Sequence, residues 1–120
     1  MKAAQLEKVV VAALEDIKGK DIEVINTARL SPLFERIVVA SGDSNRQVRS
    51  LARNVADKVR EAGGEILSTE GEDGGEWVLV DLGDIVVHIM QPAIRSHYNL
   101  EELWGGKGPE RVRKALAVSA

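Results

Sequence analysis

The feature that most constrains the fold is the stretch over residues 76–90, EWVLVDLGDIVVHIM, because its composition is typical of a β-hairpin. Residues 77–81 are expected to form one strand and residues 84–90 the other, with Leu82 and Gly83 as a two-residue turn. Gly83 supplies the positive φ that the third position of a type II turn requires. The stretch therefore predicts two adjacent antiparallel strands.

The predicted hairpin has two chemically different faces, because side chains alternate along a strand. One face collects branched aliphatic residues: Val78, Val80, Ile85, Val87 and Ile89. The other face is mixed: Trp77, Leu79, Asp81, Asp84, Val86, His88 and Met90. The turn places Asp81 opposite Asp84 and Trp77 opposite His88. We expect the first face to join the core, the second to face outward towards a partner, and Leu82 to lie exposed at the tip.

Length and composition indicate one small domain. The chain has 120 residues, of which 44% are hydrophobic, and a net charge of −3 that gives no overall attraction to nucleic acid. No apolar run approaches the roughly 18 residues that span a bilayer. Acids at Glu7, Glu15 and Asp16 make the first apolar stretch an amphipathic helix, not an export signal, so we expect a cytoplasmic protein. The absence of cysteine excludes disulfides and thiolate metal sites.

The remaining elements follow from apolar periodicity and from turn residues. The predicted elements are a helix over residues 2–18, strands over residues 21–26 and 36–41, a helix opened by Ser44 and closed by Gly63 and Gly64, a strand over residues 65–68, the hairpin, and a short helix over residues 92–98. Ser44 and Gln47 form a capping-box pattern. The strand–helix–strand unit over residues 36–67 predicts that its two strands pair in parallel.

The predicted fold class is α/β (α+β), a mixed five-stranded sheet flanked by helices in the order α-β-β-α-β-β-β-α. Part of the apolar connection over residues 27–35 is expected to pack. A further helix after Asn99 ends the domain, which we place at residues 1–104, and residues 105–120 are expected to be a mobile C-terminal tail.

Several motifs together resemble one protein family. They are Ala13-Leu14-Glu15-Asp16-Ile17-Lys18 with Asp21-Ile22; Ser41-Gly42 with Ser44 and Arg46-Gln47-Val48; Glu70-Gly71 before Trp77; Asp81-Leu82-Gly83-Asp84-Ile85-Val86-Val87-His88; and Arg95, Tyr98, Leu100, Glu101, Leu103 and Trp104. Their order and spacing over about residues 4–104 resemble the Iojap family of ribosomal silencing factors (RsfS).

The resemblance implies a nucleotidyltransferase-like fold without catalysis or cofactor. Family members bind large-subunit ribosomal protein fourteen where the small subunit docks, and thereby block subunit joining and repress translation. Carried over by position, the partner-binding residues are Trp77, Leu82, Asp84, His88 and Met90. Alanine at Trp77 or Leu82 is then expected to release the protein from large subunits without unfolding it. Family members form dimers, so a homodimer is a further option.

Two of these residues also have a structural interpretation. Trp77 is either an interface anchor or a side chain packed within the domain, since tryptophan is usually mostly buried. Met90 is either contact surface or the edge of the core. A third functional option is support of large-subunit assembly.

Two acids invite an enzymatic interpretation. Asp81 and Asp84, if opposite one another, would have Cβ atoms ~5 Å apart and could share a cation. The residues Gly42-Asp43-Ser44 look like a remnant of the nucleotidyltransferase Gly-Ser turn, but the acids flank a turn at a spacing of three instead of sharing one strand. As turn residues they would instead accept hydrogen bonds from backbone N–H groups. We therefore predict no enzymatic activity.

Histidine chemistry has weaker support. His88 lies ~13 Å from Asp84 along a strand at ~3.3 Å per residue, which is too far for a catalytic relay. His88 and His97 without further ligands make a poor zinc site, so no metal is expected.

A row of arginines lies on one face of the second predicted helix, at Arg46, Arg49 and Arg53. Such a row could contact ribosomal RNA phosphates. A solvated helix face is the commoner explanation, and Asp57 and Glu61 dilute the charge. Minor RNA contact is therefore a secondary prediction.

Overall fold

The computed structural model of the chain describes residues 1–29 and 32–98. The elements are α1 (Ala3–Asp16), β1 (Lys20–Asn26), β2 (Arg36–Ser41), α2 (Asn45–Glu61), β3 (Ser68–Glu70), β4 (Trp77–Asp81), β5 (Ile85–Met90) and α3 (Pro92–Tyr98). The predicted element order and the mixed five-stranded sheet are confirmed. The predicted helix after Asn99 and the predicted tail over residues 105–120 lie outside the described residues.

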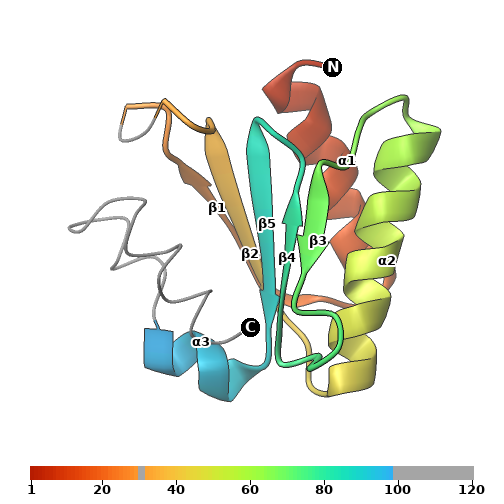
Figure 1. Cartoon of the computed structure of the whole chain (residues 1–120), viewed down its shortest axis with the longest axis vertical. Coiled ribbons are helices and arrows are strands. Elements are labelled where there is room, and N and C mark those ends of the chain that lie inside the picture. Colours follow the sequence, from red (N-terminus) through yellow and green to blue (C-terminus); the bar gives the residue numbers. More distant parts are fainter. Residues whose placement is uncertain (30–31, 99–120) are drawn as a thin grey trace.

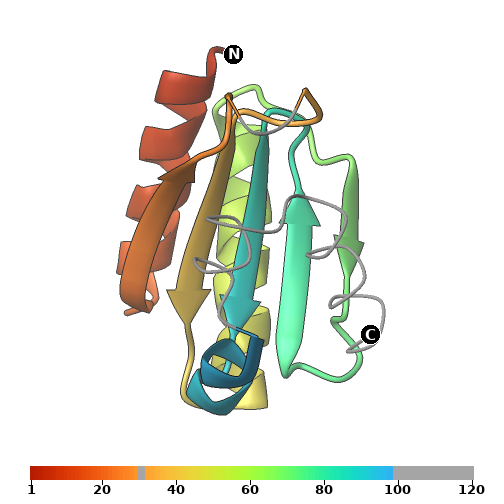
Figure 2. The ribbon, with the colours of Figure 1, turned by 90° about the vertical axis from the view of Figure 1, so that its left-hand side faces the viewer.

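The five strands lie in the order β1-β2-β5-β4-β3, side by side in Figure 2. β2 pairs in parallel with β5, and the other neighbours pair antiparallel. The predicted pairing of the strands that flank α2 is wrong, because β5 and β4 lie between them and β3 pairs with β4 at the far edge. These strand pairings make β3 run in the same direction as β2.

Helices cover both sides of the sheet. Figure 1 shows α1 and α2 together on one side and α3 on the other. The core beneath α1 and α2 contains the whole aliphatic face of the hairpin, as predicted: Val78, Val80, Ile85, Val87 and Ile89. The stripes that face this core include Leu6, Val10 and Leu14 of α1 and Val48, Leu51 and Val55 of α2. None of the described helices combines the length and the apolar composition that crossing a membrane requires.

The start of α2 confirms the predicted cap by Ser44, although Gln47 bonds back to Asp43 instead of to Ser44, and it joins the two long helices. Ser44 Oγ accepts a hydrogen bond from the Gln47 N–H at 3.1 Å, and Gln47 Oε1 accepts from the Asp43 N–H at 2.7 Å. Gln47 Nε2 then donates to the carbonyl oxygens of Ile17 and Lys18 at the end of α1, at 3.3 and 3.2 Å. The side chain that completes the cap thus also ties α1 to α2.

The opposite face of the sheet is a second apolar cluster. Its buried members are Phe34, Ile37, Val39, Trp77, Leu79, Val86 and Met90, with Ile25 and Ile94 packed against them. Phe34 and the buried Thr27 confirm that part of the connection over residues 27–35 packs, since Thr27 Oγ1 donates to the Phe34 carbonyl oxygen at 3.2 Å. The central strands are therefore buried on both faces.

The turn between β4 and β5 is longer than predicted. Asp81 pairs with Val86, and Trp77 pairs with Met90, so the register differs by two residues from the predicted one. The Leu82 N–H donates to the Ile85 carbonyl oxygen at 2.9 Å and closes the turn, while Gly83 adopts a φ of 90°. A shift of two residues keeps every side chain on its predicted face. The faces were therefore right and the cross-strand partners wrong.

Candidate functional site

The five residues expected to bind a partner do not form one exposed surface. Trp77, His88 and Met90 share the sheet face opposite α1 and α2, but they are only 3%, 1% and 0% exposed. Leu82 is 7% exposed and packs in the helix-side core. Asp84 alone among the five is exposed. The expectation of an outward-facing hairpin surface with a free tip at Leu82 is therefore wrong.

The same residues also lie at opposite ends of the sheet. Trp77 and Met90 pair where β4 begins and β5 ends, whereas Leu82 and Asp84 lie in the turn at the other end. The four residue steps along β4 separate these ends by ~13 Å. These five residues therefore cannot contact one partner as a single surface, because three are buried in the sheet and the exposed Asp84 lies in the turn.

Trp77 and His88 form a buried polar pair. The indole Nε1–H donates to His88 Nδ1 at 3.0 Å, and the ring centroids are 5.8 Å apart. Burial lowers the pKa of His88 to about 3, so the imidazole is neutral at physiological pH. A neutral ring with an unprotonated Nδ1 is the form that can accept the indole hydrogen. The burial supports the structural interpretation of Trp77.

The lowered pKa of His88 predicts acid-sensitive stability. The folded chain keeps His88 neutral down to about pH 3, whereas the unfolded chain protonates it near the ordinary value of 6.5. The unfolded state therefore binds more protons below pH 6.5, and the free energy of unfolding falls as pH decreases. We expect a loss of about 2 kcal/mol between pH 7 and pH 5, measured by urea unfolding.

The second histidine provides the control for this experiment. His97 is exposed in α3, so His97→Gln should keep the pH dependence, while His88→Leu should abolish it. An unchanged pH dependence in His88→Leu would contradict the assignment of this effect to His88.

The paired-acid geometry is not formed. Asp81 lies opposite Val86, and its Oδ1 accepts a hydrogen bond from the Gly83 N–H at 2.9 Å. The Asp84 carbonyl oxygen accepts from the N–H groups of Glu35 and Arg36 at 2.8 and 3.1 Å. Asp81 thus acts as a turn residue, as the structural alternative predicted. Among the described residues, no three histidine, cysteine or acidic side chains are grouped closely enough to hold a metal ion.

The arginine row on α2 is divided between two roles. Arg49 donates from Nε to the Glu72 carbonyl oxygen at 2.8 Å and from Nη2 to the Asp73 carbonyl oxygen at 2.7 Å, which fixes the turn before β4. Arg46 and Arg53 are exposed. RNA contact therefore stays a prediction for these two, while Arg49 is already engaged within the domain.

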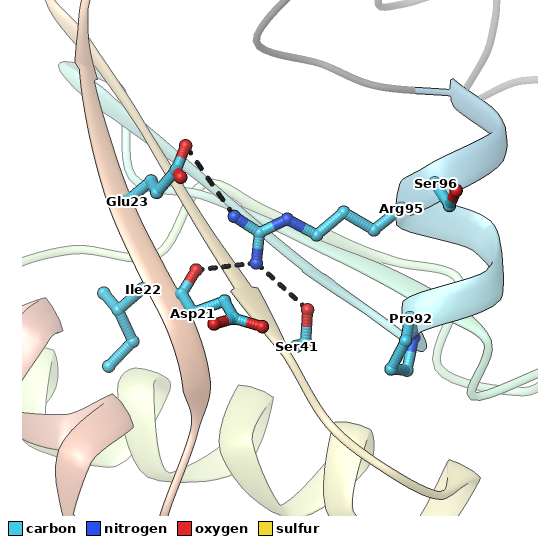
Figure 3. A pocket seen from close by; sticks show the side chains of 7 residues that line it. All are labelled: Asp21, Ile22, Glu23, Ser41, Pro92, Arg95 and Ser96. Carbon is cyan, nitrogen blue, oxygen red and sulfur yellow. Dashed lines mark hydrogen bonds and ion pairs between the residues drawn. The ribbon is translucent and has the colours of Figure 1, made fainter.

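Arg95 is a functional candidate that the sequence analysis noted only within the family pattern. Figure 3 shows it reaching from α3 across β2 to β1, in a pocket that Pro92 and Ser96 also line. Its Nη1 donates to the Asp21 carbonyl oxygen at 2.6 Å and to Ser41 Oγ at 3.0 Å, and its Nη2 lies 3.8 Å from Glu23 Oε2. Arg95 thus fixes α3 against the sheet. The register irregularity in β1 between Lys20 and Glu23, which includes Asp21, has no signal in the sequence.

Comparison with known proteins gives a consistent result. Residues 1–119 match the family model described as "Ribosomal silencing factor during starvation", so the match continues past residue 104. The chain is 54% identical to the ribosomal silencing factor RsfS of Chromobacterium violaceum over 91% of this chain and 89% of that protein. A crystal structure of a Chromobacterium violaceum protein superposes with a TM-score of 0.86 at 54% identity, covering 91% of each chain. The mouse protein named "Mitochondrial assembly of ribosomal large subunit protein 1" is 29% identical over 78% of this chain and 42% of its own length. Kinship to nucleotidyltransferases stays a prediction.

Proposed function

This chain belongs to the RsfS family of ribosomal silencing factors, and from that premise we propose that it binds the large ribosomal subunit through large-subunit ribosomal protein fourteen. Bound there, it sterically blocks association with the small subunit and so represses translation in the cytoplasm. The observation that carries the proposal is the family match over residues 1–119, together with 54% identity to a ribosomal silencing factor.

The contact surface that we propose assigns different roles to the five candidate residues. Asp84 is exposed in the turn and can contact a partner directly. Trp77, His88 and Met90 are buried, so they stabilise the sheet instead of touching the partner. Leu82 anchors the turn in the helix-side core. Alanine at Leu82 should therefore cost stability before it affects binding.

Sedimentation of the tagged protein with separated ribosomal subunits tests the proposal. We expect the protein to sediment with the large subunit alone, and Asp84→Lys to weaken this binding without lowering the free energy of unfolding. Glu15→Lys, an equally drastic change at an exposed site in α1, is the control and should bind normally. Sedimentation with the small subunit, or with neither subunit, would refute the proposal.

A role in large-subunit assembly is the second candidate, favoured by the name of the mouse relative. Ribosome profiles of a strain lacking the protein separate the two functions. Accumulation of immature large subunits indicates assembly, whereas excess joined ribosomes in starved cells indicate loss of silencing.

We propose that the protein is not an enzyme. The hydrogen bond that Asp81 accepts from Gly83, and the register that places it opposite Val86, argue against a two-carboxylate nucleotidyltransferase site. Incorporation of nucleotides in the presence of magnesium or manganese would overturn this part of the proposal. The expected homodimer is a separate question, which sedimentation equilibrium of the purified protein answers.

The remaining arginines predict a measurable salt effect if they contact ribosomal RNA. Each phosphate contact adds about 0.9 to the slope of log affinity against log salt. Replacing both Arg46 and Arg53 by glutamine should therefore make this slope about two units shallower. Arg60→Gln is the control, because Arg60 lies on the same helix and is paired with Asp57 at 4.0 Å. Equal slopes in the parent and the double variant would exclude RNA contact by this row.

A further inference from the structure

Exposed apolar side chains lie beside exposed acids at one end of the sheet. Leu33 is 55% exposed and Leu67 is 60% exposed, although both are large aliphatic residues. Glu35 and Asp84, in the same region of the chain's surface, are also exposed. We call Leu33, Glu35, Leu67 and Asp84 the sheet-end surface.

Backbone hydrogen bonds place Glu35 and Leu67 beside the β4–β5 turn, and Leu33 lies two residues before Glu35 in the chain. The Glu35 N–H donates to the Asp84 carbonyl oxygen at 2.8 Å, and the Leu67 N–H donates to the Asp81 carbonyl oxygen at 2.8 Å. The connections before β2 and before β3 therefore flank the β4–β5 turn on its two sides. In Figure 1 this turn lies at the end of the sheet away from α3. Leu67 lies directly beside the turn, because a Cβ at Gly83 would be in ordinary van der Waals contact with Leu67 Cδ1, at 3.6 Å.

The chemistry of the sheet-end surface suits a protein more than a nucleic acid. Two exposed leucines offer apolar area whose burial is favourable, by about tenfold in affinity for each side chain that is fully covered. The carboxylates of Glu35 and Asp84 repel phosphate, as does that of the half-buried Asp81 at the end of β4. Arg29 is an exposed basic side chain in the connection that leads to Leu33. An apolar patch bordered by lysine or arginine is the complementary partner surface.

We infer that the sheet-end surface docks a protein of the large ribosomal subunit, one whose exposed apolar patch is bordered by basic side chains. The inference rests on the proposed function and adds to it the contact residues Leu33, Glu35 and Leu67. It also assigns Asp84 a partner group, a lysine or arginine. The two leucines supply buried area, and the two acids select a basic protein over RNA.

Two double variants and a matched control test the inference in the full chain. Leu33→Ser with Leu67→Ser removes the apolar area, and Glu35→Lys with Asp84→Lys reverses the charge. Val24→Ser is the control, because Val24 is 41% exposed on the edge strand β1 and lies opposite Val38, inside β2, instead of in the connections at the end of the sheet. Since all these side chains are exposed, the variants should unfold at the parent's urea concentration. We expect each double variant to bind isolated large subunits at least tenfold more weakly, and Val24→Ser to bind within twofold of the parent.

The outcomes separate the inference from the proposed function. If the parent binds large subunits and both double variants bind within twofold of it, the inference is wrong and the proposed function stands. If the parent does not bind large subunits, both fail. Deproteinised large-subunit RNA serves as the second probe. Parent binding to this RNA as tight as to whole subunits would also overturn the inference, because it would identify RNA as the partner.

Discussion

Replacing Trp77 by alanine is expected to lower the free energy of unfolding by about 3–5 kcal/mol, as measured by urea unfolding with far-ultraviolet circular dichroism. The side chain is 3% exposed and packs in the second apolar cluster, so its removal leaves a large cavity. It also removes the donor that His88 Nδ1 accepts from at 3.0 Å. The burial of Trp77 argues against the expectation that Trp77→Ala leaves the fold intact. Weak ribosome binding by this variant would therefore reflect its lower stability.

A double-mutant cycle isolates the hydrogen bond within this effect. Trp77→Phe keeps most of the ring volume but leaves His88 without its donor, at a cost of about 1–3 kcal/mol. His88→Leu removes the acceptor from the indole N–H. The double variant should be less destabilised than the sum of the two single variants, because neither orphaned group remains. A loss below about 1.5 kcal/mol for Trp77→Ala would show that the site tolerates the cavity and that Trp77 contributes little to the fold.

The sequence predicts the two faces of the hairpin because alternation along a strand does not depend on the turn. Val78 and Val87 face the helices whether Asp81 pairs with Asp84 or with Val86, since the two registers differ by an even number of residues. The register itself depends on how the turn closes. Two contacts close the turn. The carboxylate hydrogen bond from the Gly83 N–H to Asp81 agrees with the turn interpretation of this acid, whereas no local pattern predicts the backbone bond from Leu82 to Ile85.

The polar residues of the second face predict exposure to solvent, but this face is buried. His88 is buried because the Trp77 indole satisfies it, and this partner lies on another strand. A signal was nevertheless present in the sequence. The nearly continuous apolar run of residues 85–90 is typical of a strand buried on both faces and paired in parallel, as β5 is with β2.

The candidate site was predictable only where it depends on motifs. Their order identified the family, but the exposed leucines lie in connections that have no periodicity. Part of the connection over residues 27–35 was expected to pack, and Phe34 is buried whereas Leu33 is exposed. The contacts of Arg49 and Arg95 reach residues 24 and 74 positions away, respectively, so they follow from the topology of the sheet and from no local pattern.

Gly71→Ala is expected to destabilise the protein by about 3 kcal/mol, although the substitution adds a single methyl group. Gly71 has a φ of 84°, a conformation that alanine adopts only with strain, and a Cβ there would collide with the carbonyl oxygen of Trp77 at the start of β4. The collision involves backbone on both sides, so no side-chain rotation can relieve it. Urea unfolding measures the loss, and hydrogen exchange should show it concentrated in the pairing of β3 with β4.

Gly74 offers a matched control three residues away in the same turn. No atom lies within 4 Å of a Cβ built on Gly74, so Gly74→Ala should change the free energy of unfolding by no more than about 0.5 kcal/mol. Equal stability of the two variants would mean that the turn can move away from β4. In that case the hydrogen bonds from Arg49 to Glu72 and Asp73 would not hold the turn in place, and the position of Trp77 would not depend on it. A large loss confined to Gly71→Ala would instead show that Trp77 is held by backbone contact at the start of its strand as well as by His88.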